Sequence, residues 1–265
     1  RERLAFVPED YWVIKGSFDE DENAFIAPHA TARFKAEAEA NAVMAHVEGQ
    51  SSARVESITK RKRTVTPPLP FNTTSLMAAA SAEGLTPART MRLAESLYMD
   101  GYISYPRADN TVYPSSLDLA DTVKKIMGNP AYTPYCKQLL SGGPLHATRG
   151  KKETTDHPPI YPTAMATPDN LPAAEYKLYN LIARRFLATL SDAAIVEGTK
   201  VSLVVGGEEF VAKGDVLVKP GFRGIYPYGL KKDEQLPALE EGQEIAFNGA
   251  TCTKDQTKPP ARYSQ

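Results

Sequence analysis

Several features that are scarce in this sequence exclude whole classes of protein. It has only two cysteines, Cys136 and Cys252, which lie far apart and match no disulfide or metal pattern, so a reducing cytoplasm is the expected location. No run of about 18 apolar residues is present, so no membrane span is predicted. With 31 basic and 32 acidic residues, the chain is not a uniformly basic nucleic-acid coat, and a polyanion would have to be bound by local clusters of cations.

The motifs of common hydrolases are also missing. There is no Gly-rich phosphate loop with Lys-Ser/Thr, no Cys/His zinc pattern and no Gly-x-Ser-x-Gly, which disfavours nucleotide and serine hydrolysis. An acidic run at residues 19–22 has the spacing of some Mg²⁺ sites. It follows Gly16-Ser17 with no strand leading into it, so we interpret it as a solvated turn and predict no metal ligands in this chain.

Length and composition predict an ordinary folded protein. The 265 residues are 42% hydrophobic and 24% charged, enough for one large domain or two modest ones, and 21 prolines indicate stiff loops and domain crossings. The chain begins with Arg1, carries no secretory segment and stops at Gln265 without a closing element. We therefore expect it to be a piece of a longer protein.

The order of secondary-structure signals is β, then α, then β. In residues 1–70, a short apolar run at 11–14 precedes a predicted helix over 28–47 and a predicted strand over 53–65, and the Pro-rich residues 66–70 indicate a domain crossing. In residues 71–195, Thr86-Pro87 begins a helix that ends at Gly101, and Ser115-x-x-Asp118 predicts a capping box for a helix ending near Gly128.

A third helix within residues 71–195 is predicted over residues 175–190. Its apolar side chains from Tyr179 to Leu190 recur at helical spacing and are expected to pack in a core. In residues 196–265, strands at 200–205 and 209–212 flank the hairpin signal Gly206-Gly207, with further short strands at 216–218 and 244–247. The predicted fold is therefore mixed α and β and multi-domain: a β-rich domain formed by residues 1–70 and 196–265, interrupted by an inserted, mostly helical domain of residues 71–195.

The densest group of reactive side chains lies at residues 101–110. Pro106 favours an extended Tyr105, and alternate side chains of an extended segment share a face, so Tyr105, Arg107 and Asp109 are expected to point the same way. A guanidinium beside a phenol favours the phenoxide and can hold a phosphate, which makes Tyr105 and Arg107 a candidate nucleophile pair. Spacing alone favours the other interpretation, a half-buried tyrosine with a surface arginine, in a chain that has 13 tyrosines.

Other candidate residues would contact phosphates. His157 lies in a stiff loop before two prolines, where it is either a phosphate ligand or a loop histidine bonded to a carbonyl. Cations at residues 60–63 and 184–185, with others near His157, either form a solvated face or line a phosphate-binding surface, with aromatic residues as stacking platforms. The cations near His157 are Arg149, Lys151 and Lys152, and those at 184–185 are Arg184 and Arg185.

The motifs resemble those of the type IA DNA topoisomerases in the same order along essentially the whole chain. They are FNTTSL at 71–76, GLTP at 84–87, LYMDGYISYPR at 97–107, DHPPIYPT at 156–163 and PPARY at 259–263. The resemblance implies a helical catalytic-tyrosine domain carried by a β-rich arch, which is the central-domain fold of that family. It also implies ATP-independent cleavage of one DNA strand through a 5′-phosphotyrosine, strand passage and religation, which relaxes negative supercoils.

The resemblance also implies roles for single residues. Tyr105 falls on the nucleophile and Arg107 on the arginine that positions the scissile phosphate; His157 falls on a histidine that contacts DNA phosphate, and Asp109 on a neighbouring position of weaker role. Ala108 departs from the family, which usually has Thr there, and is expected to tune cleavage. Mg²⁺ is implied for the intact enzyme, bound by an N-terminal domain outside this chain, so no metal is expected here.

The expected partners are single-stranded DNA and that N-terminal domain of the same parent chain, with no membrane, in a monomeric cytoplasmic protein associated with the nucleoid. The chain alone is expected to bind single-stranded DNA weakly and to relax no supercoils. Two alternatives remain open: a non-catalytic single-stranded nucleic-acid-binding module, and the topoisomerase half of a reverse gyrase. Tyrosine recombinases and type IB enzymes use a dispersed Arg and His set around a late tyrosine, which the β-α-β order does not suit.

Overall fold

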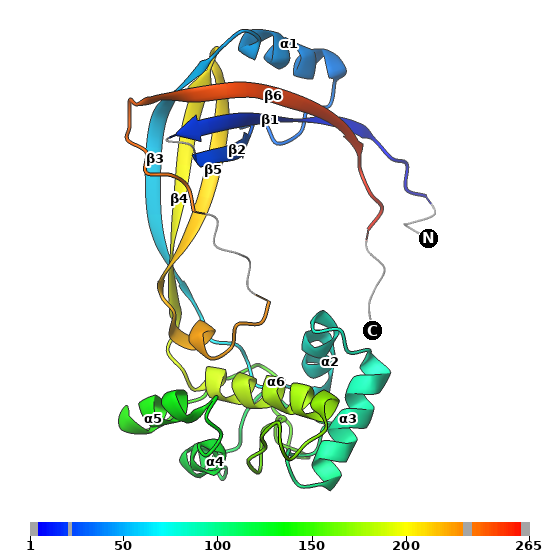
Figure 1. The fold of residues 1–265 in the computed structure, drawn as a ribbon. Helices are drawn as coiled ribbons and strands as arrows, with labels where there is room; N and C mark the ends of the chain where they lie inside the picture. Colours follow the sequence, from blue (N-terminus) through cyan, green and yellow to red (C-terminus); the bar gives the residue numbers. More distant parts are fainter. Residues whose placement is uncertain (1–4, 21–22, 230–234, 261–265) are drawn as a thin grey trace. The chain divides into compact units, whose positions relative to one another are not determined.

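The computed structural model describes residues 5–20, 23–229 and 235–260, and it divides the chain into two compact units (Figure 1). The first unit comprises residues 1–63, 197–216 and 233–265, and the second comprises residues 64–196 and 217–232. Residues 217–232, which the sequence analysis assigned to the β-rich part, belong to the second unit. They do so because Phe222, Ile225 and Tyr226 are buried in its core.

A mixed sheet-and-helix architecture was predicted, and the structure confirms it. One sheet has the strand order β2-β1-β6-β3-β4-β5 within the described residues. The strands are β1 Asp10–Glu20, β2 Asn23–Pro28, β3 Ser52–Val65, β4 Ala194–Val205, β5 Glu208–Lys219 and β6 Glu244–Gln256. β1 pairs antiparallel with both β2 and β6, and helix α1, Glu37–Val47, contacts β1 and β6. The core of the first unit includes the rings of Phe18, Phe210 and Phe247, whose centroids lie 5.4–6.2 Å apart.

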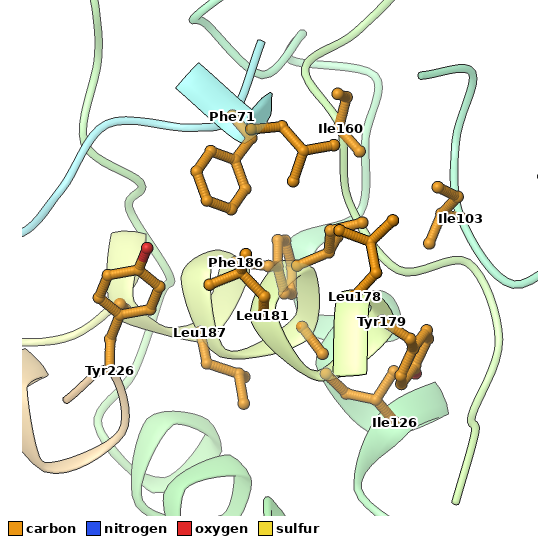
Figure 2. Packing of buried hydrophobic residues seen from close by; sticks show 14 of the residues in the cluster. Phe71, Ile103, Ile126, Ile160, Leu178, Tyr179, Leu181, Phe186, Leu187 and Tyr226 are labelled. Atoms are coloured by element: carbon orange, nitrogen blue, oxygen red, sulfur yellow. The ribbon is translucent and has the colours of Figure 1, made fainter. Parts of the chain in front are cut away.

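The second unit is built around a buried helix. Its elements are α2 Thr73–Ala82, α3 Pro87–Met99, α4 Leu119–Ile126, α5 Thr133–Ser141, α6 Ala173–Thr189 and the 3₁₀ helix η1 Gly221–Gly224. The predicted stripe of α6 is core, since Tyr179, Ile182 and Phe186 are fully buried. Figure 2 shows Phe71 and Ile160, from two loops, packed over α6. None of the described helices combines the length and apolar character that a membrane crossing requires.

Some sequence predictions about the first unit were wrong. β1 continues to Glu20, so a strand does lead into the acidic run, because its residues pair with β2 and β6; Asp21 and Glu22 lie outside the described residues. The helix predicted over 28–47 begins only at Glu37, because Pro28 is paired in β2 and His29 and Phe34 form bridges to other strands. The two strands predicted at 209–212 and 216–218 are one strand, β5, and the strand predicted at 244–247 continues to Gln256.

The cap predicted for α4 was also wrong. The helix begins after Asp118, whose side chain accepts a 2.9 Å hydrogen bond from the backbone N–H of Asp121. Asp118 is therefore the N-cap itself rather than the third residue of a box opened by Ser115. The cap predicted for α3 is confirmed, because Thr86 accepts from the N–H of Arg89 and Pro87 stands in the first turn.

Candidate functional site

The end of α3 sets the course of the segment that carries Tyr105. Gly101 adopts a φ of 79°, in the left-handed region that glycine tolerates best, and so ends the helix. The N–H of Tyr102 donates back to the carbonyl of Leu97 at 2.8 Å, which satisfies an end carbonyl of the helix. The chain then leaves α3, and residues 104–112 are in no helix or strand.

Burial alternates along this segment as expected for an extended chain. Pro106 and Ala108 are buried, whereas Arg107 and Asp109 are exposed and Tyr105 is half-buried. The three polar side chains therefore share the outward face, in agreement with the sequence analysis.

Tyr105 lies between two other rings. Its centroid is 4.6 Å from that of His157, with the planes tilted by 51°, and 5.2 Å from that of Tyr98 in an edge-to-face arrangement. His157 is exposed, and Tyr98, near the end of α3, keeps 41% of its surface exposed. A phenol, an imidazole and a second phenol thus meet at the surface of the second unit, although Tyr105 and His157 are separated by more than fifty residues of sequence.

Arg107 is paired with a carboxylate from α3. Its Nε donates to Oε1 of Glu95 at 3.1 Å, and its Nη2 donates to the same oxygen. The hydrogen bonds to Glu95 raise the pKa of Arg107, and the nearby phenol of Tyr105 adds a smaller effect in the same direction, so the guanidinium stays charged. Both side chains are about half exposed, so this ion pair is weak and exchangeable.

Three loops are joined by backbone hydrogen bonds beneath these side chains. The N–H of Ser104 donates to Tyr161 at 2.9 Å, and the N–H of Thr163 donates to Tyr102 at 2.9 Å. The N–H of Ile160 donates to Phe71 at 2.8 Å. The segment of Tyr105, the segment of His157 and the entry to α2 are thereby fixed to one another.

Three of the cations predicted to bind phosphate, Arg149, Lys151 and Lys152, are exposed. Lys152 forms an ion pair with Asp109, and Arg149 forms one with Glu153, while Lys151 is exposed. These side chains all lie on the exposed surface of the second unit, and the pair of Lys152 and Asp109 continues the outward face that begins at Tyr105.

Arg184 serves the interior of the second unit. Its Nε donates to Asn180 at 3.0 Å and its Nη1 donates to the carbonyl of Ile225 at 2.9 Å, which ties α6 to the end of η1. The structure does not bring it to Tyr105, so we leave it out of the candidate site. The cations at residues 60–63 belong to the first unit, where they are exposed along β3 and Arg63 pairs with Asp215.

Described residues do not fit a magnesium site. No group of three or more His, Cys, Asp or Glu side chains among them is placed to hold a metal ion. Two carboxylates of this region, Asp109 and Glu95, are each paired with a cation.

Glu95 and Tyr98 were not identified from the sequence. Their i, i+3 spacing on α3 places them on one helix face, but which face meets Tyr105 depends on tertiary packing.

Comparisons with known proteins identify the family of the chain. The family model described as DNA topoisomerase matches residues 1–265. The DNA topoisomerase 1 of Archaeoglobus fulgidus is 39% identical over 259 residues, which cover 98% of this chain and 38% of that protein. The DNA topoisomerase 3-beta of Arabidopsis thaliana is 33% identical over 257 residues, which cover 96% of this chain and 30% of that protein.

The fold has a counterpart among solved structures. Full-length topoisomerase I from Thermotoga maritima superposes with a TM-score of 0.71 at 24% identity, covering 99% of this chain and 43% of that one. The chain thus spans 30% to 38% of the length of the two curated relatives. With the family model matched over residues 1–265, the chain belongs to the type IA DNA topoisomerase family.

Proposed function

We propose that this chain carries the nucleophile of a DNA topoisomerase that cleaves one DNA strand, passes another strand through the break and reseals it without ATP, relaxing negative supercoils. The observation that carries the proposal is the contact between the rings of Tyr105 and His157, which come from two separate motifs. Arg107 lies in the same motif as Tyr105. A phenol, a charged guanidinium and an imidazole on one exposed face are suited to the attack on a phosphodiester.

The proposed step exchanges one phosphoester bond for another. Oη of Tyr105 attacks the phosphorus, a bond from phosphorus to Oη forms, and the bond to the 3′ oxygen breaks. The phenol loses its proton and the leaving 3′ oxygen gains one, so the strand ends in a 3′ hydroxyl and a 5′-phosphotyrosine. Because one ester replaces another, the 3′ hydroxyl reverses the step without an external energy source.

Arg107 and His157 are proposed to stabilise the charge on the phosphoryl oxygens. Arg107 donates from Nε and Nη2 to a single oxygen of Glu95 at the surface, and an arriving phosphate offers the same two donors a pair of oxygens. His157 is proposed to donate a ring N–H to the phosphate. Lys151, Lys152 and Arg149 are proposed to contact the DNA backbone beyond the scissile phosphate, with Asp109 setting the position of Lys152.

Mg²⁺ is proposed to bind in an N-terminal domain of the same parent protein, because the described residues here do not fit it. The chain alone is accordingly proposed to bind single-stranded DNA weakly and to relax no supercoils. Unpaired strands are favoured because exposed rings such as Tyr98 stack on bases that are not already stacked.

A cleavage assay tests the proposal. A single-stranded oligonucleotide labelled at its 3′ end keeps its label on the protein if the tyrosine takes the 5′ phosphate. The chain alone, the chain with the separately made N-terminal domain, and that mixture with Tyr105→Phe are incubated with Mg²⁺ and stopped with denaturant. Tyr98→Phe is the matched control, because it removes the hydroxyl of a neighbouring phenol. The ring centroids of Tyr98 and Tyr105 are 5.2 Å apart.

The expected adduct requires both pieces and Tyr105, and survives in Tyr98→Phe. No adduct in any mixture, with DNA binding intact, would indicate a module that binds single strands without cutting them.

A further inference from the structure

We propose that two hydroxyl groups, those of Thr73 and Ser104, are positioning groups that hold Tyr105 and Arg107 in place for the reaction. The inference rests on the proposed function of Tyr105. Both hydroxyls bond backbone groups: that of Thr73 bonds the residues on either side of Arg107, and that of Ser104 bonds the loop that follows His157.

Thr73 brackets Arg107 from both sides. Its Oγ1 donates to the carbonyl of Pro106 at 2.8 Å, with the carbonyl of Ala108 next nearest at 3.1 Å. The same oxygen accepts from the N–H of Ala108 at 2.9 Å, and the N–H of Thr73 donates to the carbonyl of Ala108 at 2.9 Å. One side chain thus satisfies backbone groups immediately before and after Arg107.

Thr73 is itself held rigidly. It is the first residue of α2, and the preceding Asn72 forms a capping box with Ser75: Asn72 accepts from the N–H of Ser75 at 2.9 Å, and the Ser75 hydroxyl accepts from the N–H of Asn72 at 3.1 Å. Because the helix start is fixed, the position of the Thr73 hydroxyl is fixed too.

Ser104 joins the tyrosine segment to the histidine loop. It is 8% exposed, its Oγ donates to the carbonyl of Pro159 at 3.2 Å, and it accepts from the N–H of Tyr161 at 3.0 Å. Ser104 directly precedes Tyr105, and Pro159 is two residues after His157. The Ser104 hydroxyl therefore joins the two segments within two residues of the rings of Tyr105 and His157, whose centroids are 4.6 Å apart.

These contacts matter because the segment lacks a ladder of its own. Residues 104–112 are in no helix or strand, so their backbone groups depend on side chains and neighbouring loops. Removing either hydroxyl leaves buried backbone partners unsatisfied and frees the segment to shift. A shift of about 1 Å in a reacting group lowers rates by about a hundredfold.

Four variants separate positioning from general stability. Thr73→Val and Ser104→Ala remove the hydroxyls, and Thr73→Ser keeps the hydroxyl while removing the methyl group. Thr90→Val is the control: this threonine is 0% exposed, and its hydroxyl donates only to the carbonyl of Thr86, at 3.0 Å, within α3 and its cap. Thermal unfolding confirms that each variant is folded before it is compared.

The first readout is independent of cleavage. It is the NMR chemical shift of the His157 ring, recorded on the 265-residue chain with isotope-labelled histidines. The aromatic ring of Tyr105 is expected to displace this signal, and Tyr105→Leu gives its position without that ring. We expect Thr73→Val and Ser104→Ala to move the signal at least halfway to the Tyr105→Leu position, and Thr73→Ser and Thr90→Val to leave it unmoved. A hydroxyl-free variant whose signal stays at the wild-type position removes that residue from the proposal.

The second readout is adduct formation with the N-terminal domain present. Thr73→Val and Ser104→Ala are expected to form adduct about ten- to a hundredfold more slowly, with DNA affinity within about twofold of wild type and rates restored in Thr73→Ser. Equal rates in all variants overturn the positioning roles. Absence of adduct in the wild type instead defeats the proposed function, and the histidine signal then still decides whether the hydroxyls position the rings.

Discussion

Phe71 supports the candidate site from below, and replacing it by alanine gives a sharp test of the packing described above. The ring is 0% exposed, and the guanidinium of Arg185 lies 4.4 Å from its centroid. Its carbonyl accepts from the N–H of Ile160, three residues after His157. Phe71→Ala therefore empties space beside Ile160 and over α6 (Figure 2).

The expected loss follows from burial. Truncating a fully buried phenylalanine costs about 3–5 kcal/mol, and the lost contact with Arg185 adds up to about 1 kcal/mol. Since domain stabilities are about 5–15 kcal/mol, this change removes a large share of the stability of the second unit. With urea m-values of about 1–3 kcal/mol/M, the unfolding midpoint falls by at least about 1 M.

Two probes report on the two units. The single tryptophan, Trp12, lies in β1 of the first unit, whereas helical circular dichroism reports mainly on the second unit. Each unit has its own buried cluster, so Phe71→Ala is expected to shift the dichroism midpoint more than the Trp12 fluorescence midpoint. Phe71→Leu, which keeps most of the apolar volume, should cost about 1 kcal/mol. A loss below about 1 kcal/mol for Phe71→Ala, or an equal shift of both probes, would refute the reasoning.

Three further predictions concern other parts of the chain. Gly206→Ala should destabilise the first unit by at least about 2 kcal/mol in urea unfolding, because φ is +57° and an added Cβ would lie 2.1 Å from the carbonyl oxygen of His46. His46 lowers the pKa of Glu208 from 4.5, so the stability that Glu208→Gln removes, about 1 kcal/mol, should be present above pH 4.5 and vanish as the pH falls below it. Burial raises the pKa of Cys136 to about 11, so alkylation at pH 8 followed by mass spectrometry should modify the half-buried Cys252 first.

Local signals in the sequence predicted the elements of the second unit well. Thr86 and Pro87 fix the start of α3 and Gly101 its end, because each acts within one turn of its own position. The stripe of α6 is long enough that its period alone indicates a buried helix. Residues 53–65 read correctly as a strand, and β3 extends over them.

Elements whose boundaries depend on distant partners were predicted less well. The strand β1 runs on to Glu20 because β2 and β6 pair with its polar end, which no local pattern reveals. Residues 217–232 join the helical unit because Phe222 and Tyr226 find their apolar partners there. The sequence likewise placed Tyr105 and Arg107 on one face, since they are two residues apart, but the carboxylate of Glu95 reaches Arg107 only through tertiary packing.

Ala108 illustrates how the structure changes the meaning of a sequence difference. The resemblance to the topoisomerase family implies Thr at this position, and the sequence alone therefore suggests a lost hydroxyl beside the reactive groups. Ala108 is 4% exposed and faces the core, and both of its backbone groups are bonded to Thr73. The segment is thus held by a hydroxyl from α2, and a side-chain hydroxyl at residue 108 is not needed to orient its backbone.

Ala108→Thr should therefore change the rate of adduct formation less than Thr73→Val does, within about threefold of wild type. The comparison uses both variants with the N-terminal domain present and the same 3′-labelled oligonucleotide. If Ala108→Thr instead raised the rate tenfold or more while Thr73→Val left it unchanged, the missing hydroxyl would be the limiting feature of this site. The backbone contacts of Thr73 would then be incidental to the chemistry, because the segment would keep its working geometry without them.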